Sequence, residues 1–336
     1  MKFLSLLYFL ILSFFSFSQS EKYTFSQPKM GSPLTITMYA NDSSKASYIA
    51  NEAYKIADSL NIIYSDYLEK SELNELSKKA GINTFTKVSP ALWEMLNLSI
   101  KAAQQSKGAY DITIGSIVKL WRKARKEKVF PEENKLKNAL KAVGYQHIIL
   151  DSTTHSVKLL RANTQLDVGG IGKGYVAQVI VNFCISKGIE KVLVDAGGKL
   201  AMVTQVDKPW RIGITIPNSE ELIPLYLRLQ NQAVATSGNK YQFVEIGGKK
   251  YSHIVNPRTG LGLTHQQNVT AIAPDGATAD WLATACSVLS VRKALRLIES
   301  MPNCALFMAE IQRGKLKVWQ SKGFEEYLEN YLFHIK

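Results

Sequence analysis

Cysteine is scarce in this sequence, with three residues in 336, and the count is odd. Cys184 and Cys286 lie in apolar stretches with helical spacing, and the third is Cys304. A disulfide framework is therefore not expected even in an oxidising compartment, and we predict buried free thiols instead.

Long apolar runs are missing after the first 20 residues, so no later segment is predicted to cross a membrane. The one apolar run, from Phe3 to about Phe15, follows Lys2 and precedes small serine residues at the spacing of a cleavage site. It is shorter than the roughly 20 residues that span a bilayer. Residues 1–18 are therefore predicted to form a secretory signal peptide, with an uncleaved membrane anchor as the alternative.

No cysteine lies near the predicted cleavage site, so the acceptor residue of a bacterial lipoprotein anchor is absent. We expect a soluble, exported protein. It would associate with the inner membrane only through an uncleaved signal or through a membrane-bound partner.

Positive charge is in excess, with a formal net charge of +13. Such an excess can serve nucleic acid, an acidic membrane surface or a phosphorylated ligand. The densest basic cluster is WRKARKEKVF at 121–130, which contains Glu127 and precedes the charged stretch PEENKLKNALK. Because no motif of a nucleic-acid-binding fold accompanies it, we interpret the cluster as the solvated face of a helical hairpin and expect no nucleic-acid partner.

Hydrophobic periodicity divides the chain into a helix-rich part up to about residue 145 and a strand-rich part after it. Apolar residues recur at helical spacing over 43–64, 90–106, 175–187, 278–289 and 291–300. Strands are predicted for SPLTITMYA, HIILD, SVKLL, KVLVDA, WRIGIT, LYLRLQ, AVATSG, YQFVEIG, KKYSHIV and NVTAIAP. This order indicates an α+β fold with largely antiparallel or mixed sheets flanked by helices. No repeat or linker interrupts residues 19–336, so we predict a single domain there.

A glycine-rich stretch, DVGGIGKGYVAQ at Asp167 to Gln178, resembles two phosphate-binding patterns and satisfies neither. A P-loop would need glycine where Asp167 stands and a hydroxyl residue where Gly174 stands. A dinucleotide fingerprint would need a third glycine at Tyr175 and a parallel sheet. A helix that begins near Gly172 could still direct unpaired amides at an anion. A tight strand-to-helix turn without a ligand is the alternative.

The stretch TADWLAT places Asp280 and Thr284 four residues apart, on one face of a predicted helix. Both side chains offer the oxygen ligands that a hard cation prefers. Without further context, Asp280 could equally be an acidic residue stabilised by the helix dipole.

Five stretches of the sequence carry a further signal together. They are GAYDITIG, LDVGGIGKGYVAQ, VDAGGKLAM, ATSGNKYQF followed by YSHIVNPRTG, and TAIAPDGATADWLATACSVL. In their order and spacing they resemble the ApbE family, the FAD:protein FMN transferases, formerly called thiamine biosynthesis lipoproteins, and the resemblance runs from about residue 28 to near residue 310. The resemblance implies an ApbE-like, T-fold-like architecture.

The resemblance also implies an activity. A periplasmic or surface enzyme would bind FAD with Mg²⁺, cleave its pyrophosphate and pass FMN to a threonine or serine hydroxyl of a target protein, leaving AMP. The acceptor would be an exported or membrane-bound redox protein. Two alternatives stay open: a FAD pyrophosphatase that releases FMN and AMP, and a periplasmic protein that stores FAD without turnover.

The family pattern assigns roles to individual residues. It implies that His253 is catalytic, as imidazole titrates near neutrality and can accept the proton of the attacking hydroxyl, although a lone histidine at a strand end is often only structural. It implies that Asp280, Thr284 and a backbone carbonyl of Gly170 bind Mg²⁺. The residues implied to bind FAD or line its cleft are Met30, Tyr67, Ala109, Tyr110, Asp111, Asp167, Lys173, Thr236, Ser237, Gly238 and Ile254.

Three positions depart from the family pattern towards lower acidity. Gln178 and Asn256 stand where aspartate is common, and Lys199 stands where VNAGGD would have an acid. We expect these changes to affect metal affinity or the choice of acceptor, without removing an implied Mg²⁺ ligand.

Overall fold

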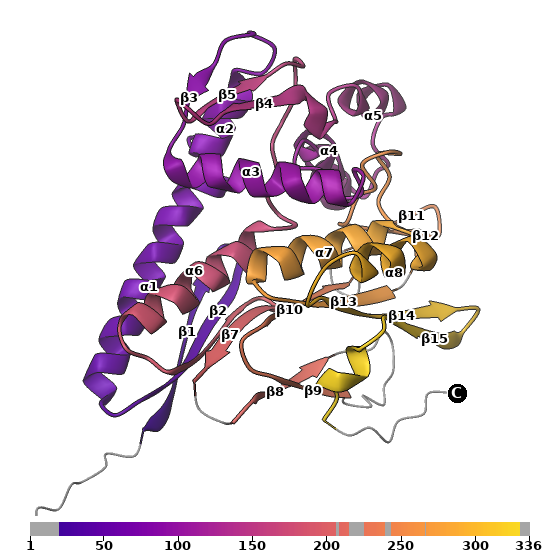
Figure 1. Ribbon diagram of the computed structural model, residues 1–336. Coiled ribbons are helices and arrows are strands. Elements are labelled where there is room, and N and C mark those ends of the chain that lie inside the picture. The colour runs from indigo at the N-terminus through magenta and orange to yellow at the C-terminus, as the bar shows by residue number, and fades with distance from the viewer. Residues whose placement is uncertain (1–19, 206–207, 215–224, 239–242, 266, 330–336) are drawn as a thin grey trace, which may run out of the picture.

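The computed structural model describes residues 20–205, 208–214, 225–238, 243–265 and 267–329 (Figure 1). The predicted signal peptide, residues 1–18, lies outside the described residues. No helix in the described ranges is both long and apolar enough to cross a membrane.

Helices cover one face of the structure's largest sheet and form most of the part above it (Figure 1). The helices are α1 Ser43–Tyr64, α2 Glu72–Lys78, α3 Pro90–Gln105, α4 Gly115–Glu127, α5 Glu133–Leu140, α6 Gly172–Ser186, α7 Gly276–Val288 and α8 Val291–Glu299, with short 3₁₀ turns at Tyr145–His147 and Phe324–Tyr327.

Fifteen strands lie in the described residues. They are β1 Glu21–Lys29, β2 Ser32–Ala40, β3 Thr86–Lys87, β4 Ile148–Asp151, β5 Ser156–Leu159, β6 Lys191–Ala196, β7 Lys199–Thr204, β8 Trp210–Ile214, β9 Leu225–Leu229, β10 Ala233–Gly238, β11 Phe243–Ile246, β12 Lys249–Ser252, β13 Gln267–Ala273, β14 Ala305–Gln312 and β15 Lys315–Gln320.

The largest sheet has the strand order β1-β2-β6-β7-β10-β13-β14-β15. Each neighbouring pair in it is antiparallel. Figure 1 shows α6, α7 and α8 on one face of this sheet and the β8–β9 hairpin on the other. The predicted α+β fold with largely antiparallel sheets is confirmed.

Two tight turns bring chain segments to the same edge of the structure. In the β1–β2 hairpin, Lys29 pairs with Ser32, so Met30 and Gly31 form a two-residue loop. Both have positive φ, 51° and 74°, as a type I′ hairpin turn requires. Gly197 and Gly198 make the corresponding turn between β6 and β7, with φ of 65° and 82°.

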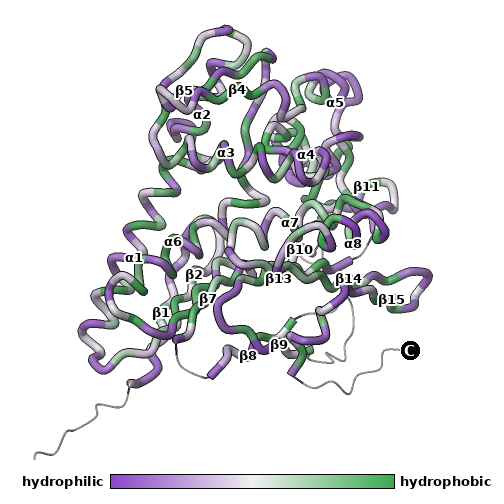
Figure 2. The backbone as a smooth tube through the Cα atoms, in the orientation of Figure 1, coloured by the Kyte–Doolittle hydropathy of each residue, from purple (hydrophilic) through white to green (hydrophobic). Residues whose placement is uncertain are grey.

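Three hydrophobic clusters hold these layers together. The largest lies between the main sheet and helices α1, α3, α6 and α7. A second packs β8 and β9 against the opposite face of the sheet, where the rings of Phe307 and Phe324 stack with their centroids 5.3 Å apart. A third surrounds Trp121 and joins α4 and α5 to β11 and β12. Figure 2 shows the hydrophobic strands of the main sheet and the predominantly hydrophilic surface helix α5.

The strongly periodic elements predicted from the sequence are present. Ser89 caps α3, with its Oγ accepting a hydrogen bond from the Leu92 amide, and Pro90 occupies the first helical position. Helices α6 and α7 begin two to three residues before the apolar periodicity becomes visible. The predicted helical hairpin of the basic region is α4 and α5. Cys184, Cys286 and Cys304 are free, and the first two are buried as predicted.

Candidate active site

A cavity of about 1460 Å³ lies between the helices on the main sheet and the upper part of the fold. It is larger than the roughly 300–1,000 Å³ of most small-molecule sites. Every residue predicted from the sequence for catalysis, FAD binding or metal binding lines it: Met30, Tyr67, Ala109, Tyr110, Asp111, Asp167, Gly170, Lys173, Thr236, Ser237, Gly238, His253, Ile254, Asp280 and Thr284. These residues are up to 254 positions apart in the chain, so the fold gathers them.

The glycine-rich loop owes part of its composition to helix packing. A Cβ on Gly174 would lie 2.0 Å from the carbonyl oxygen of Gly276, so α6 and α7 touch backbone to backbone at this point. The contact brings the Oδ2 of Asp280, one turn further along α7, within 3.0 Å of the Gly174 amide, whose hydrogen bond it accepts. Gly174 therefore positions Asp280.

Three oxygen donors converge where α7 meets the loop. Thr284 Oγ1 donates to the carbonyl oxygen of Gly170 at 3.5 Å, and a Cβ on Gly170 would lie 2.9 Å from Thr284 Cγ2. Asp280 is fully buried, and its Oδ1 has no hydrogen-bond partner. Burial raises the pKa of Asp280, while Lys199 lowers it. An orphaned buried carboxylate oxygen beside a hydroxyl and a carbonyl fits a hard cation such as Mg²⁺.

This donor set is sparse. Nowhere in the described ranges do three or more His, Cys, Asp or Glu side chains gather as a metal site. Magnesium commonly keeps several waters and binds through one or two carboxylates together with substrate phosphates. A Mg²⁺ site with a single protein carboxylate is consistent with this mode of binding.

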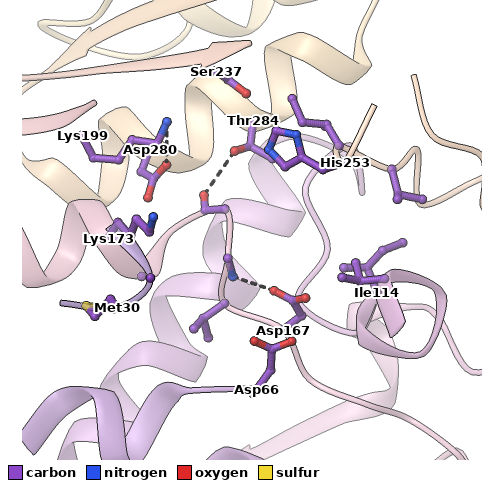
Figure 3. A pocket seen from close by; sticks show the side chains of 18 of the residues that line it. Met30, Asp66, Ile114, Asp167, Lys173, Lys199, Ser237, His253, Asp280 and Thr284 are labelled. Atoms are coloured by element: carbon purple, nitrogen blue, oxygen red, sulfur yellow. Dashed lines mark hydrogen bonds and ion pairs between the residues drawn. The ribbon is translucent and has the colours of Figure 1, made fainter. Parts of the chain in front are cut away.

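Two lysines stand close to Asp280 in the cavity (Figure 3). Lys173 Nζ donates to Ser32 Oγ at 2.9 Å. Burial lowers the pKa of Lys173, and the charge of Lys199 lowers it further. Lys199 Nζ donates to the carbonyl oxygen of Thr236 at 2.5 Å and lies 3.9 Å from Asp280 Oδ1.

The prediction that the amides at the start of α6 bind an anion is wrong for two of them. Helix α6 does begin at Gly172. However, the Gly172 amide donates to Val168 O at 2.7 Å, and the Gly174 amide donates to Asp280. Both amides already donate to acceptors within the protein. The ammonium group of Lys173 is therefore better placed than these amides to bind an anion in the cavity.

A second cluster of charges lies on another wall of the cavity. Arg122 Nη2 forms ion pairs with Asp66 Oδ2 at 2.5 Å and Asp167 Oδ2 at 3.6 Å. Its guanidinium lies 3.8 Å from the centre of the Tyr67 ring. Burial, reinforced by the charge of Asp66, raises the pKa of Asp167 to about 6. Asp167 also accepts a hydrogen bond from the Gly169 amide at 2.7 Å.

Arg122 and Arg125 were not predicted as site residues, and the interpretation of their region as a solvated face is wrong for both. They line the cavity together with Val118. The spacing of four and three residues places all three on one face of α4. Lys123, between them, is 65% exposed and follows the prediction. The helical spacing of these three residues could have indicated a common face. The many charged residues around them favoured the interpretation as a solvated helix instead.

Met30 reaches the cavity from a backbone conformation that side chains rarely adopt. Asn or Gly usually occupies the positions of positive φ in this type of turn. Placing a residue with a larger side chain, such as Met30, in this left-handed conformation destabilises the fold by roughly 1–2 kcal/mol. A methionine kept at such a position, on a cavity wall, is consistent with a role in contacting a ligand.

Asp111 lines the cavity but is also needed by the local structure. Its Oδ1 accepts hydrogen bonds from the amide and hydroxyl of Thr113, and its Oδ2 accepts one from the Tyr145 amide. These bonds fix the loop that carries Ala109 and Tyr110 on the cavity wall. The hydroxyl oxygen of the buried Tyr110 lies 3.3 Å from the hydroxyl oxygen of Ser99, within hydrogen-bond distance.

His253 follows the last residue of β12, and Figure 3 shows its ring in the cavity with Thr284, Asp280 and Lys199. Its segment is tied to α4 by Trp121. The indole Nε1 donates to Gly260 O at 2.7 Å, and the indole ring contacts the Tyr251 ring with centroids 5.0 Å apart. Helix α4 therefore positions both Arg122 and the segment that carries His253.

Of the three departures from the family pattern, only Lys199 lines the cavity. Gln178 Oε1 accepts a hydrogen bond from the Gly276 amide at 3.1 Å and thereby joins α6 to the start of α7. Asn256 Oδ1 accepts one from the Arg258 amide at 2.9 Å within its turn. Gln178 and Asn256 therefore stabilise local structure, while Lys199 changes the charge at the site.

Known proteins resemble the chain over most of its length. A FAD:protein FMN transferase of Klebsiella pneumoniae (strain 342) is 29% identical over 279 residues, covering 82% of this chain and 85% of that protein. One of Treponema pallidum (strain Nichols) is 28% identical over 309 residues, covering 86% and 84%.

Solved structures show the same fold. The apo form of Pseudomonas stutzeri flavinyl transferase ApbE superposes with a TM-score of 0.81 at 26% identity, covering 92% of this chain and 97% of that one. The flavin transferase ApbE from Vibrio cholerae gives 0.82 at 25% identity, covering 92% and 100%. The model of the ApbE family matches residues 30–308, close to the range predicted from the motifs, and the chain therefore belongs to the ApbE family.

Proposed function

We propose that this protein transfers FMN from FAD to a threonine or serine hydroxyl of a target protein, with Mg²⁺, and releases AMP. The observation that carries the proposal is the buried Oδ1 of Asp280, which accepts no hydrogen bond, beside Thr284 and Gly170 in one cavity with His253. The names of the relatives, FAD:protein FMN transferase, support the same activity.

The residues divide the work of a phosphoryl-group transfer. Asp280, Thr284 and the Gly170 carbonyl would hold Mg²⁺, which neutralises charge on the phosphate oxygens when bound. Lys173, whose ammonium faces the same space, would bind the pyrophosphate. His253 would accept the proton of the acceptor hydroxyl as its oxygen attacks the phosphorus of the FMN half. The bond from that phosphorus to the bridging oxygen breaks, and AMP leaves.

The remaining cavity residues would hold the two ends of FAD. Met30, Tyr67, Tyr110 and Ile254 offer apolar or aromatic surface to a planar ring. Asp167 offers a hydrogen-bond acceptor, and Thr236, Ser237 and Gly238 offer hydroxyl and amide donors along β10. The cavity volume of about 1460 Å³ leaves room for an acceptor side chain beside FAD.

We further propose that the protein acts after export, on an exported or membrane-bound redox protein. The amino-terminal sequence predicted as a signal peptide supports this location. A fusion of residues 1–30 to a reporter that is active only outside the cytoplasm would test it, with residues 19–30 as the control fusion.

The activity can be tested directly. Purified protein is incubated with FAD, Mg²⁺ and a flavin-accepting domain, and the domain is examined by mass spectrometry. A gain of one FMN with equimolar AMP is expected. Free FMN and AMP without a modified domain would favour the pyrophosphatase, and unchanged FAD bound tightly would favour storage. Chelation of Mg²⁺ is expected to stop the transfer.

A further inference from the structure

Lys199 occupies a fixed position at the edge of the proposed cation site. It is the first residue of β7, directly after the Gly197–Gly198 turn. Its side chain is only 15% exposed, and its Nζ lies 3.9 Å from Asp280 Oδ1. That separation is too long for a hydrogen bond but short enough for strong electrostatic attraction in a buried site.

The surroundings keep the ammonium group in place. Its hydrogen bond to Thr236 O, 2.5 Å long, ties it to β10, on which Ala235 pairs with Lys199 itself. The Thr236 amide donates back to Gly198 O at 3.2 Å. A Cβ on Gly197 would lie 2.6 Å from Ser32 Oγ, so the turn is also packed against the residue that binds Lys173.

A fixed ammonium group has opposite effects on the ligands of this site. It attracts the Asp280 carboxylate, and it repels a divalent cation that approaches the same carboxylate. It also attracts the pyrophosphate of FAD. The pyrophosphate carries negative charge that compensates both the ammonium and the divalent cation.

We propose that Lys199 couples the two ligands, so that Mg²⁺ binds weakly to the free protein and tightly once FAD is present. Before FAD binds, Lys199 serves as the counter-ion of Asp280. After FAD binds, the negative pyrophosphate compensates part of the positive charge of Lys199, and Mg²⁺ binds to Asp280. The inference rests on the proposed function, and it adds a linkage between the cation and FAD that is reciprocal by thermodynamic necessity.

The test compares Mg²⁺ binding with and without FAD. Isothermal titration calorimetry gives the Kd for Mg²⁺ in the presence and absence of saturating FAD, with every protein carrying His253→Ala so that FAD is not consumed. For the protein with Lys199 intact, FAD is expected to tighten Mg²⁺ binding by about tenfold or more. Lys199→Met should tighten Mg²⁺ binding in the absence of FAD, and FAD should tighten Mg²⁺ binding by a smaller factor in this variant than in the protein with Lys199 intact. The remaining FAD effect would come from direct contact between Mg²⁺ and the FAD phosphates.

Two further variants separate charge from structure. Lys199→Arg keeps the positive charge and should retain most of the coupling. Lys191→Met is the matched control: Lys191 is a buried lysine of the neighbouring strand β6 that donates to the backbone oxygen of Lys208 at 2.8 Å, and it does not line the cavity. It should leave both Kd values unchanged.

The outcomes are distinct. If Lys199→Met binds Mg²⁺ without FAD no more tightly than the intact protein, while its circular dichroism and thermal midpoint show a folded chain, the coupling role is wrong. If Lys199→Met does not fold, Lys199→Gln, which keeps a donor for Thr236 O, replaces it under the same criterion. If the protein with Lys199 intact binds neither FAD nor Mg²⁺, the proposed function itself fails.

Discussion

Gly174 and Gly276 face each other where α6 crosses α7, with no room for a side chain on either. A Cβ on Gly174 would lie 2.0 Å from Gly276 O, and a Cβ on Gly276 would lie 2.1 Å from Gly174 O. The same contact sets the hydrogen bond from the Gly174 amide to Asp280. Helix packing and the proposed cation site therefore depend on one pair of residues.

Gly174→Ala should disturb both. The added methyl group must push backbone apart, which costs about 1–3 kcal/mol in an overpacked core. The displaced α7 would carry Asp280 away from Gly170. We expect a lower thermal midpoint and at least about tenfold weaker Mg²⁺-dependent transfer. Gly213→Ala is the control, because its Cβ would approach only Tyr226, at 3.4 Å. An unchanged thermal midpoint for Gly174→Ala would contradict the packing argument.

Asp280→Asn should remove the response to Mg²⁺. Asparagine can still accept the hydrogen bond from the Gly174 amide, but it lacks the charge that binds the cation. Ligands that bind the native state raise its thermal midpoint, so Mg²⁺ with FAD should stabilise the unmodified protein more than the variant. Transfer should fall by at least about a hundredfold. Asp151→Asn serves as control: Asp151 accepts hydrogen bonds from the Thr153 amide and the Thr154 hydroxyl and does not line the cavity. A Mg²⁺ response retained in Asp280→Asn would contradict the assignment.

The sequence predicted which residues line the cavity better than it predicted the elements around the cavity. Motifs that begin as far apart as residues 108 and 270 could be recognised because their chemistry requires particular residues at short local spacing, as in TADWLAT. Strands β1, β3, β14 and β15 and helix α2 were not predicted. β1 is half-exposed at the sheet edge, and β15 is largely polar, KLKVWQ. Their pairing with β2 and β14 makes them strands, and that information is not local.

The same limit explains why Arg122 was missed. A run of mixed charges normally indicates a solvated helix face, and nothing in WRKARKEK distinguishes Arg122 from Lys123. The distinction comes from Asp66 and Asp167, which approach Arg122 from other segments. Likewise, the local sequence could not show that Gly174 packs against Gly276 of α7.

The pKa of Asp167 predicts a pH dependence of stability. Burial and the charge of Asp66 raise it from 3.8 to about 6. The folded state therefore retains this proton to a higher pH than the unfolded chain does. The proton on Asp167 therefore stabilises the folded state. This stabilisation is fully present below about pH 4 and is lost as the pH rises through about 6. Its loss amounts to about 3 kcal/mol.

Asp167→Asn stays neutral and can still accept the Gly169 amide hydrogen bond. Without FAD, its thermal midpoint should exceed that of the unmodified protein at pH 7.5, and the difference should shrink towards pH 4.5. Differential scanning calorimetry at both pH values measures this. Asp66→Asn should shift the transition to lower pH. A difference that is the same at both pH values would show that Asp167 does not titrate in this window.

Arg122→Ala should weaken FAD binding through Tyr67. The Tyr67 residue is 76% exposed, and the guanidinium 3.8 Å from its ring centre is its cation–π partner. Loss of this contact and of the Asp66 and Asp167 ion pairs should free the ring and lower FAD affinity by about tenfold. Flavin fluorescence titration gives the Kd. Lys123→Ala, which removes an exposed neighbouring charge, should leave it unchanged. Equal affinities for the two variants would exclude a positioning role for Arg122.

His253→Ala should separate binding from chemistry. His253 lines the cavity, but the proposed Mg²⁺ ligands and Lys173 lie on other elements. FAD and Mg²⁺ should therefore bind with Kd values within about threefold of the unmodified protein, while transfer falls by roughly 10² to 10⁴, the usual contribution of general base catalysis. Mass spectrometry of the acceptor measures transfer, and calorimetry measures binding. His265→Ala is the control, because His265 lies outside the cavity lining. Full transfer by His253→Ala would mean that another group accepts the hydroxyl proton.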